Sequence, residues 1–399
     1  MSAIIEVPNH IPASLVRDFD FQELHGEEDV YVSWKRVQDE YPDVFFTPRN
    51  GGHWVATRHA DIDYMLQHYE QFSSAEQMIP KAGKVGTTPP VDMDPPVHTE
   101  FRKLLMPFFT AKAISALELR ARELTVSLID EFYARGECEF IGDFAKKMPI
   151  GIFLSMVDLP DSDRVELVDL VEQIQRGKTP ELRQQGYTRL HEYLALVIES
   201  RRVKPGEDIL SALVKATVEN GRPLTHEELL GMGVTLLGGG LDTVAASLGF
   251  WSLFLAHNPD HRRQIIENPQ IIPAAVEELL RRFQVGNMGR VVVKDMTYKD
   301  CLFKAGDLMM VATSCAGLDE RRYPEPLAVD FGRTDKRSLI FGRGPHQCLG
   351  QLLARTELRI FLEEWLKRIP NFEVKPGEQP IASLRQSNTL QYLPLVWKC

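Results

Sequence analysis

Cys348 is the residue of this sequence best placed to do chemistry, because a glycine-rich loop leads into a helix there. Glycines flank it on both sides within the stretch 341–355. Apolar residues recur at every third or fourth position after Leu349, which predicts a long helix that ends before Pro370. Free N–H groups and the helix dipole lower the pKa of a cysteine at a helix start, which suits a thiolate. The alternative for a lone cysteine is a buried structural residue.

Two further pairs of polar residues have spacings that make them candidates for a functional site. His98 and Arg102 are four residues apart, so on a helix they share one face. Such a face is either solvated or clamps an anion, and the arginine fork suits carboxylates. Asp242 and Thr243 follow the glycines of 238–240 after one intervening residue, Leu241, inside an apolar segment. Each mid-helix glycine costs about 1 kcal/mol relative to alanine, so this run indicates close packing of helices or close approach of a ligand.

Most of the elements that position these residues are helical. Thr225 and Glu228 form a capping box that opens an apolar run ending at about His257. At about 1.5 Å per residue, this helix would span roughly 48 Å and cross the whole molecule. A break at 177–180 separates two more helices, which form either a mobile lid or a plain hairpin. Further helices are expected at 32–40, 61–69, 113–134, 142–156, 161–175, 181–202 and 274–283.

The strands expected from the sequence form only a small part of the fold. Residues 44–47 and 53–57 flank a turn and predict a β-hairpin. Short strands are also expected at 290–293, 302–304 and 308–311, followed by an irregular meander at 323–331. The first 30 residues are expected to form an extended arm, and 79–96 a long functional loop. The predicted fold class is therefore mainly α with a small β portion.

Composition excludes several functional classes. The chain has 399 residues, a net charge of −10 and a pI near 5.6, which disfavours a nucleic-acid binder. Its five cysteines are scattered without a CxxC pair, so neither a disulfide framework nor a zinc site is indicated, and a reducing cytosol fits. We expect no signal peptide, no membrane segment of ~20 apolar residues and a cytoplasmic monomer with one domain over 1–399.

The loop around Cys348 resembles the haem-ligand loop of the cytochrome P450 family. The residues that carry the resemblance are Phe341, Gly344, His346, Cys348, Gly350, Leu353, Ala354 and Arg355. The segments GGGLDTV, EELLRRF, AGLDER and LPLVW are similar to those of the bacterial camphor-hydroxylase group, and the likeness covers essentially the whole chain. The resemblance implies a single triangular, mostly helical fold with a long central helix over the haem and Cys348 beneath it.

The resemblance also implies a cofactor and a role for each matching residue. The cofactor is haem b, with the Cys348 thiolate as the axial iron ligand that favours O–O cleavage. His98, Arg102 and Arg290 would hold the propionates, while Asp242 and Thr243 would guide protons to dioxygen. Taken alone, Glu278 and Arg281 would be a surface salt bridge that contributes little to stability. In this family the pair matches the ExxR signature, which ties the core to the loop before the cysteine. The other implied cofactor-binding residues are Gly239, Gly240, Phe341, His346 and Gly350.

The implied reaction is hydroxylation of a small hydrophobic, terpenoid- or norisoprenoid-like substrate by a monooxygenase. Gly86 and Thr88 stand where the camphor enzyme has a tyrosine and another aromatic residue, so camphor itself is expected to be a poor substrate. The candidate pocket residues are Gly86, Thr88, Thr235, Leu236, Gly239, Gly286 and Met288.

Electrons must come from outside, because no flavin or nicotinamide domain fits in this length. An iron–sulfur ferredoxin with an NADH-dependent ferredoxin reductase is the expected source. The basic residues proposed to meet an acidic partner are Arg102, Lys336, Arg337, Arg343 and Arg355. Two alternatives remain: a peroxide-driven peroxygenase, which would not need the Asp242–Thr243 pair, and a non-enzymatic haem sensor, against which that pair argues.

Overall fold

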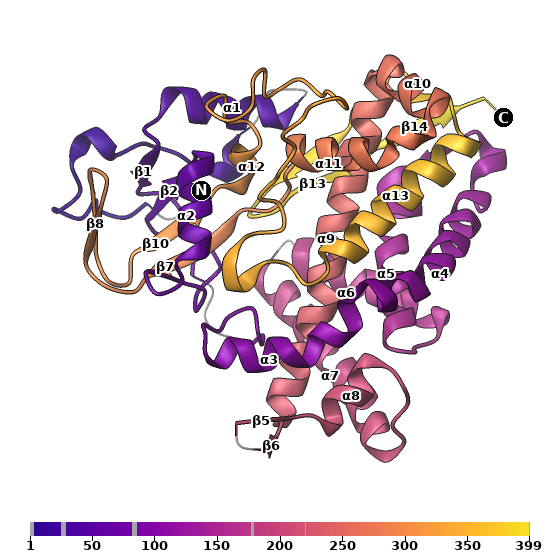
Figure 1. Ribbon diagram of the computed structural model, residues 1–399, viewed down its shortest axis with the longest axis horizontal. Helices are drawn as coiled ribbons and strands as arrows, with labels where there is room; N and C mark the ends of the chain where they lie inside the picture. Colours follow the sequence, from indigo (N-terminus) through magenta and orange to yellow (C-terminus); the bar gives the residue numbers. More distant parts are fainter. Residues whose placement is uncertain (1–3, 25–28, 82–85, 177–178, 220, 399) are drawn as a thin grey trace.

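The computed structural model describes residues 4–24, 29–81, 86–176, 179–219 and 221–398. It is 53% helical with 13% strand, which confirms the predicted mainly helical fold with a small β portion. The outline in Figure 1 is broadly triangular, with the strands of the main sheet at the left and the long helices at the right. The break predicted at 177–180 and the long loop at 79–96 both include residues outside the described ranges.

The helices follow the apolar periodicity of the sequence with ends shifted by a few residues. The described helices are α1 (Val30–Glu40), α2 (His59–Gln67), α3 (Val97–Leu105), α4 (Ala111–Asp130), α5 (Lys147–Met156), α6 (Arg164–Arg176), α7 (Pro180–Val203), α8 (Ile209–Lys215), α9 (His226–His257), α10 (Pro259–Glu267), α11 (Ile272–Arg282), α12 (Thr313–Ala316) and α13 (Gln351–Arg368).

The main sheet joins segments far apart in the chain, in the order β1-β2-β10-β7-β3. The predicted hairpin pairs Val44 with Ala56 in antiparallel register, and β10 then runs parallel to β2. The strands are β1 (Val44–Thr47), β2 (His53–Ala56), β3 (Phe72–Ser73), β4 (Glu137–Glu139), β5 (Thr217–Val218), β6 (Arg222–Pro223), β7 (Met288–Val292), β8 (Met296–Tyr298), β9 (Cys301–Phe303), β10 (Leu308–Val311), β11 (Phe372–Val374), β12 (Ile381–Leu384), β13 (Asn388–Tyr392) and β14 (Pro394–Trp397).

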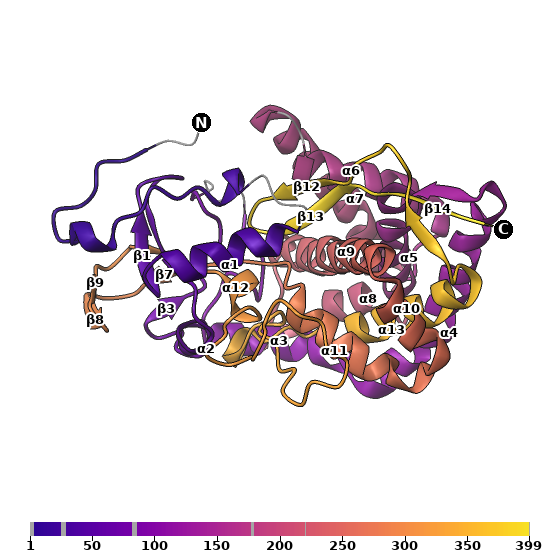
Figure 2. The ribbon, with the colours of Figure 1, turned by 90° about the horizontal axis from the view of Figure 1, so that it is seen from above.

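Helix α9 is the element around which the others pack. The predicted capping box is present, with Thr225 accepting from the Glu228 backbone and Glu228 accepting from the Thr225 backbone. Figure 2 shows α9 in the middle of the molecule, and it contacts α5, α7, α10, α13 and β13. Among the described helices it alone is long and apolar enough to cross a membrane. The expectation that no stretch comes near that composition is therefore wrong, although a core helix has the same properties.

Three apolar clusters fill the interior. The largest is formed by α4, α9, α11 and α13 and contains the fully buried Trp251 and Trp365. A second lies among α5, α6, α7, α8 and the first half of α9. The third covers the main sheet, around Trp54 and Phe303. Helix α9 belongs to the first two clusters, so close packing holds it on either side of residues 238–243: up to Leu237 in the second cluster and from Val244 in the first.

The first 30 residues differ from the expected extended arm. The described part contains 3-10 turns at Ala13–Leu15 and Phe21–Glu23, and Phe19 and Phe21 are buried in the core. Burial of these two aromatic rings stabilises the arm in a conformation folded back onto the protein.

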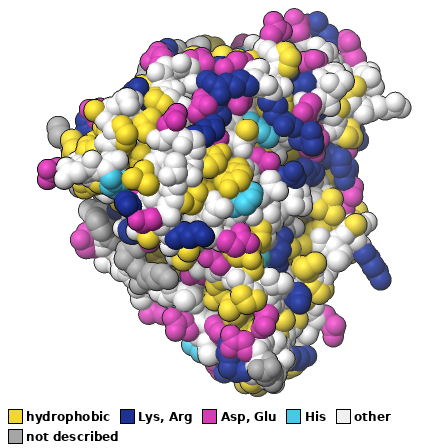
Figure 3. Space-filling view, turned by 60° about the vertical axis from the view of Figure 1, so that its left-hand side comes forward, with side chains coloured by type: hydrophobic (Ala, Val, Ile, Leu, Met, Phe, Trp, Pro, Cys, Tyr) yellow, Lys and Arg dark blue, Asp and Glu magenta, His cyan; other side chains and the backbone are white. Residues whose placement is uncertain are grey.

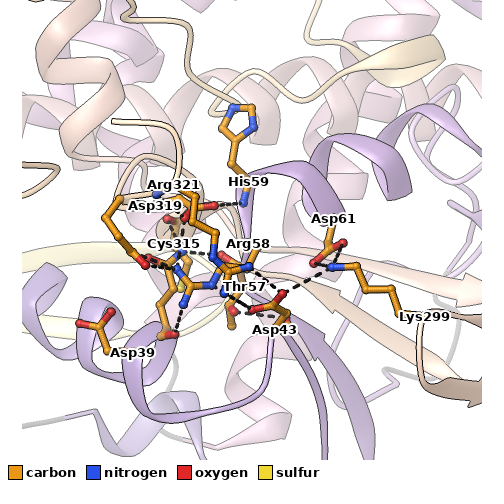
Figure 4. A network of polar contacts seen from close by, with 12 residues as sticks. Asp39, Asp43, Thr57, Arg58, His59, Asp61, Lys299, Cys315, Asp319 and Arg321 are labelled. Atoms are coloured by element: carbon orange, nitrogen blue, oxygen red, sulfur yellow. Dashed lines mark hydrogen bonds and ion pairs between the residues drawn. The ribbon is translucent and has the colours of Figure 1, made fainter. Parts of the chain in front are cut away.

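A buried polar network fixes the helical layer around α2 to the sheet side of the molecule. The Arg58 guanidinium donates to Asp43 at 3.1 Å and to Asp319 at 3.2 Å, and Arg321 also pairs with Asp43 (Figure 4). Lys299, in the turn between β8 and β9, lies 2.8 Å from the buried Asp61 of α2. On the face in Figure 3, acidic and basic side chains lie beside one another in the upper part of the view.

Candidate active site

The loop before Cys348 has the backbone that its glycines predict. Gly342 and Gly344 have φ angles of +65° and +66°, which favour glycine. A Cβ on Gly344 would also lie 2.8 Å from the Leu66 carbonyl oxygen, so the loop passes tightly against the end of α2. The Cys348 N–H donates to the Phe341 carbonyl at 2.8 Å and closes the loop just before α13 begins.

The electrostatics of Cys348 combine opposing effects. Burial raises the pKa of the thiol, while a hydrogen bond from the Gly350 N–H and the positive charges of Arg102 and Arg355 lower it, and burial dominates. The sequence led us to expect a pKa below the usual value, which is wrong for the protein alone. The reason is that burial disfavours a lone thiolate more strongly than one helix start favours it. A bound metal ion would reverse this balance, because coordination deprotonates a thiol.

Four basic side chains gather at this loop: His98 and Arg102 from α3, Arg290 from β7 and His346 from the loop itself. The His98 and His346 rings lie 4.3 Å apart, and both ring nitrogens of His98 are buried without a hydrogen-bond partner. Burial, with the nearby His346 and Arg102 charges, lowers the pKa of His98 to about 4. Arg290 is 3% exposed, and burial lowers its pKa to about 10.

The guanidinium groups of Arg102 and Arg290 bond only to backbone carbonyls and a thioether in the described part of the chain. Arg102 donates to the Gln347 carbonyl next to Cys348, and Arg290 donates to the Gly289 carbonyl at 2.7 Å. The second contact of Arg290 is the Met288 sulfur at 4.0 Å. The Arg290 guanidinium is buried and that of Arg102 is half-buried. A guanidinium in the interior that forms no ion pair is costly, which indicates that an anion completes the site.

These residues fit a haem. Its two propionates would pair with the carboxylate-free guanidinium groups of Arg102 and Arg290 and with the unpartnered ring nitrogens of His98. The Cys348 sulfur is one of the softest ligands a protein offers to iron. A Cβ built on Gly350 would lie 3.8 Å from that sulfur, so the backbone stays close to it.

The stretch of α9 around 238–243 is the second part of the predicted site. A Cβ built on Gly238, Gly239 or Gly240 would meet no atom within 4 Å, so these glycines are not explained by tight packing of helices. The Thr243 hydroxyl donates to the Gly239 carbonyl at 3.3 Å, and Asp242 is half-buried. Of the two explanations for the glycine run, the geometry favours close approach of a ligand over close packing of helices.

The other predicted pocket residues come from three segments. Thr235 and Leu236 lie on α9, two turns before Thr243. Gly86 and Thr88 lie on a loop that reaches α9, because a Cβ on Gly231 would lie 2.0 Å from the Thr87 carbonyl oxygen. The last pair comes from the segment that enters β7. Gly286 accepts a hydrogen bond from Thr313, and the Met288 methyl lies 3.6 Å from where a Cβ on Gly342 would be.

The Glu278–Arg281 pair is the centre of a buried network rather than a surface salt bridge. Both side chains are 0% exposed, and their charged groups are 2.9 Å apart. Arg281 also donates to the carbonyls of Gly317, Pro326 and Ala328. Glu278 accepts from the Asp330 N–H at 3.0 Å and from Arg333 at 3.1 Å. The pair therefore fastens α11 to the meander that leads to Cys348.

Two members of the network around the site were not found from the sequence. Asp94 lies 3.9 Å from His346 and accepts hydrogen bonds from the Ser73 hydroxyl and the Ser74 N–H. Burial alone would raise the pKa of Asp94. The hydrogen bonds with His346, Ser73 and Ser74 together lower that pKa by more than burial raises it, so the net shift is downward. Arg333 joins Glu278 from a loop 55 residues away. The Asp94-Pro95-Pro96 string was the only local signal for the first, and no spacing signals the second.

Most of the basic residues expected to form a partner patch are engaged with other groups. Arg355 pairs with Glu277 at 2.6 Å and stacks on the Phe341 ring, with its guanidinium carbon 4.4 Å from the centroid. Arg102 points to the Cys348 loop, as described above. Arg343 pairs with Asp63 and Arg337 with Asp335. Arg343 and Arg337 remain exposed, so they still contribute charge to the surface.

The chain belongs to the cytochrome P450 family, whose family model matches residues 150–396. It is 34% identical to the probable cytochrome P450 127A1 of Sinorhizobium fredii, over 94% of this chain and 93% of that protein. The crystal structure of CYP101J2 superposes with a TM-score of 0.91 at 35% identity, over 99% of this chain and 100% of that one. The crystal structure of CYP101C1 superposes with a TM-score of 0.91 at 34% sequence identity, over 99% of this chain and 100% of that one.

Membership of this family defines a haem-thiolate monooxygenase that binds haem b. The two solved structures further place the chain in the camphor-hydroxylase-like subfamily, as the segments GGGLDTV and EELLRRF predicted.

Proposed function

We propose that the chain is a ferredoxin-dependent monooxygenase that hydroxylates a small hydrophobic, terpenoid- or norisoprenoid-like compound. The observation that carries the proposal is the convergence of Cys348 with His98, Arg102 and Arg290, whose buried or half-buried basic groups form no ion pair with a carboxylate in the described part of the chain. Bound haem supplies the activation of dioxygen, which no side chain of this protein can perform.

The side chains of the site then have separate tasks. Cys348 would ligate the iron, with its thiolate stabilised by the Gly350 N–H and the charge of Arg102. Arg102, Arg290 and His98 would bind the propionates. His346, positioned by Asp94, completes that side. The Glu278–Arg281 pair keeps the meander, and with it the Cys348 loop, in place.

Asp242 and Thr243 hold the protons that the reaction consumes. The Thr243 hydroxyl is anchored to the Gly239 carbonyl at 3.3 Å, a weak bond that leaves its lone pairs free to accept. Asp242, the neighbouring carboxyl, is half-buried and can pass protons between solvent and that hydroxyl. Gly239 and Gly240 leave the adjoining side of α9 open, because a Cβ on either would meet no atom within 4 Å.

The residues predicted to line the pocket support the proposed substrate class. Thr88, Leu236, Gly286 and Met288 supply a largely apolar surface, and Gly86 adds no side chain. Such a pocket selects an apolar molecule by burial. Camphor is expected to bind more weakly than compounds that fill the space left by these small residues. The protein is also proposed to be cytoplasmic and monomeric.

The electron donor is proposed to be an iron–sulfur ferredoxin reduced by an NADH-dependent reductase. Both neighbours belong to the CYP101 group, which supports this choice. Of the basic residues at the surface near the Cys348 loop, Arg343 is exposed and can meet an acidic partner.

The test is turnover of the haem-loaded protein with a ferredoxin system and a panel of terpenoids and norisoprenoids. Thr243→Ala should leave NADH consumption in place while the product formed per NADH falls at least about 10-fold, because proton delivery loses its hydroxyl. Thr188→Ala, on the exposed face of α7, is the matched control and should not change this ratio. An unchanged ratio in Thr243→Ala together with full activity on peroxide alone would instead establish the peroxygenase.

A further inference from the structure

The hydroxyl of Thr235 on α9 is a buried polar group that has no role in the reaction proposed above. Its Oγ1 is shielded from solvent and has no hydrogen-bond partner among the residues that the structure describes. A buried hydroxyl left unpaired costs about 1–3 kcal/mol, so native proteins rarely keep one without a reason.

Six other helical hydroxyls of this protein, some buried and some exposed, bond to the carbonyl four residues earlier. Thr125, Ser155, Thr188, Thr243, Ser247 and Thr356 all do so, at 2.8 to 3.3 Å. Thr235 does not bond to Gly231 in this way. Ser252 also lacks a partner, but it is completely buried in the core, whereas Thr235 is only half-buried.

The position of Thr235 on α9 shows what its side chain faces. At 3.6 residues per turn, residues 231, 235, 238 and 242 share one side of the helix. At Gly231 this side contacts the loop that carries Thr87, and at Gly238 a Cβ would meet no atom within 4 Å. The other side of α9, with Met232 and Leu237, is packed into an apolar cluster with α7. Thr235 therefore lies between the 86–90 loop and the open side of the helix.

We propose that Thr235 is a specificity-determining residue whose hydroxyl hydrogen-bonds an oxygen atom of the substrate. It would donate to a carbonyl or ether oxygen, or exchange a hydrogen bond with a hydroxyl, in surroundings that are otherwise apolar. Seven residues of helix separate it from Asp242, which is about 10 Å along the axis. A terpenoid-sized molecule held at Thr235 by its oxygen would thus present a carbon at its far end to the catalytic centre. This inference rests on the proposed monooxygenase function and specifies which members of the substrate class are preferred.

The physical consequence is a preference between molecules of equal shape. A ketone pairs the buried hydroxyl, while the corresponding hydrocarbon leaves it unpaired. One buried neutral hydrogen bond distinguishes such a pair by about 10- to 100-fold in affinity. Adamantanone and adamantane form such a pair, because the two rigid cages differ only in the carbonyl group.

The experiment measures the dissociation constants of both probes with the haem-loaded protein, from the spin-state change in the absorption spectrum. The variants are Thr235→Val, which keeps the shape and removes the hydroxyl, and Thr235→Ser, which keeps the hydroxyl. Thr188→Val is the matched control, because this exposed threonine of α7 bonds only to its own helix. The carbon monoxide spectrum of each variant reports whether the haem site is intact.

We expect wild type, Thr235→Ser and Thr188→Val to prefer the ketone, and Thr235→Val to lose that preference by about 10- to 100-fold while binding adamantane at least as tightly. A ketone-to-hydrocarbon ratio that is the same in wild type and Thr235→Val overturns the inference. That result leaves the proposed function standing as long as the carbon monoxide spectrum and hydrocarbon binding are normal. Loss of the haem-thiolate spectrum in wild type would instead overturn the proposed function.

Discussion

The substitution Glu278→Gln tests whether the buried ion pair holds the meander that leads to Cys348. The Glu278 carboxylate accepts four hydrogen bonds: two from Arg281, one from the Asp330 N–H and one from Arg333. Glutamine has nearly the same volume but no charge, and its amide nitrogen can only donate. If that nitrogen takes the place of the oxygen that bonds Arg281 Nε, two donors face each other across 2.9 Å.

The expected loss of stability follows from the burial of the pair. Arg281 and Glu278 are both 0% exposed, so the substitution leaves a guanidinium in the interior without its counter-charge. Breaking a buried pair in this way costs about 3–5 kcal/mol. We therefore expect the urea unfolding midpoint of the haem-loaded protein to fall by that equivalent, with faster loss of haem because the meander is released.

A matched control is available on the neighbouring helix. Asp260 and Arg263 have the same i,i+3 spacing at 3.1 Å, but their side chains are 80% and 61% exposed. Asp260→Asn should change the unfolding free energy by less than about 0.5 kcal/mol. The reasoning is refuted if Glu278→Gln and Asp260→Asn shift the midpoint equally, as measured by tryptophan fluorescence in urea.

The remaining predictions concern the α9 contact and acid stability. Gly231→Ala places a Cβ 2.0 Å from the Thr87 carbonyl oxygen, so it should displace the pocket loop and weaken substrate binding by at least about 10-fold. Gly238→Ala is the control and should leave that loop in place, because its Cβ would meet no atom within 4 Å. Spin-state titrations with substrate measure both effects. Burial lowers the pKa of His53 from 6.5 to about 4, so between these pH values the unfolded chain binds more protons and stability falls as the pH falls, by up to about 3 kcal/mol. His53→Phe should flatten that part of the stability profile, and an unchanged slope would contradict the assignment.

Local patterns in the sequence predicted the helices and the cysteine loop. The apolar spacing after Leu349 placed α13, and the capping box at Thr225 placed the start of α9. The glycines before Cys348 were expected to allow a tight backbone, and Gly342 and Gly344 have positive φ angles. These features depend on interactions within a few residues, which is why a single sequence reveals them.

Long-range pairing could not be predicted in the same way. Strand β4 pairs with β14 near the other end of the chain, and Asn388 donates to Ser314 in the core. The partners of Arg281 lie 36 to 47 residues away on an irregular segment without periodicity. The balance of burial and charge at Cys348 likewise depends on Arg102, which comes from a helix more than 200 residues earlier.

The most direct test of the central claim is the absorption spectrum of the dithionite-reduced, haem-loaded protein under carbon monoxide, measured for wild type and for Cys348→His. A Cys348 thiolate on iron predicts a strongly red-shifted Soret band in wild type and its replacement by a band at the ordinary histidine-ligated position in the variant. A wild-type band at the ordinary position, or a red-shifted band that survives in Cys348→His, would show that Cys348 is not the thiolate ligand.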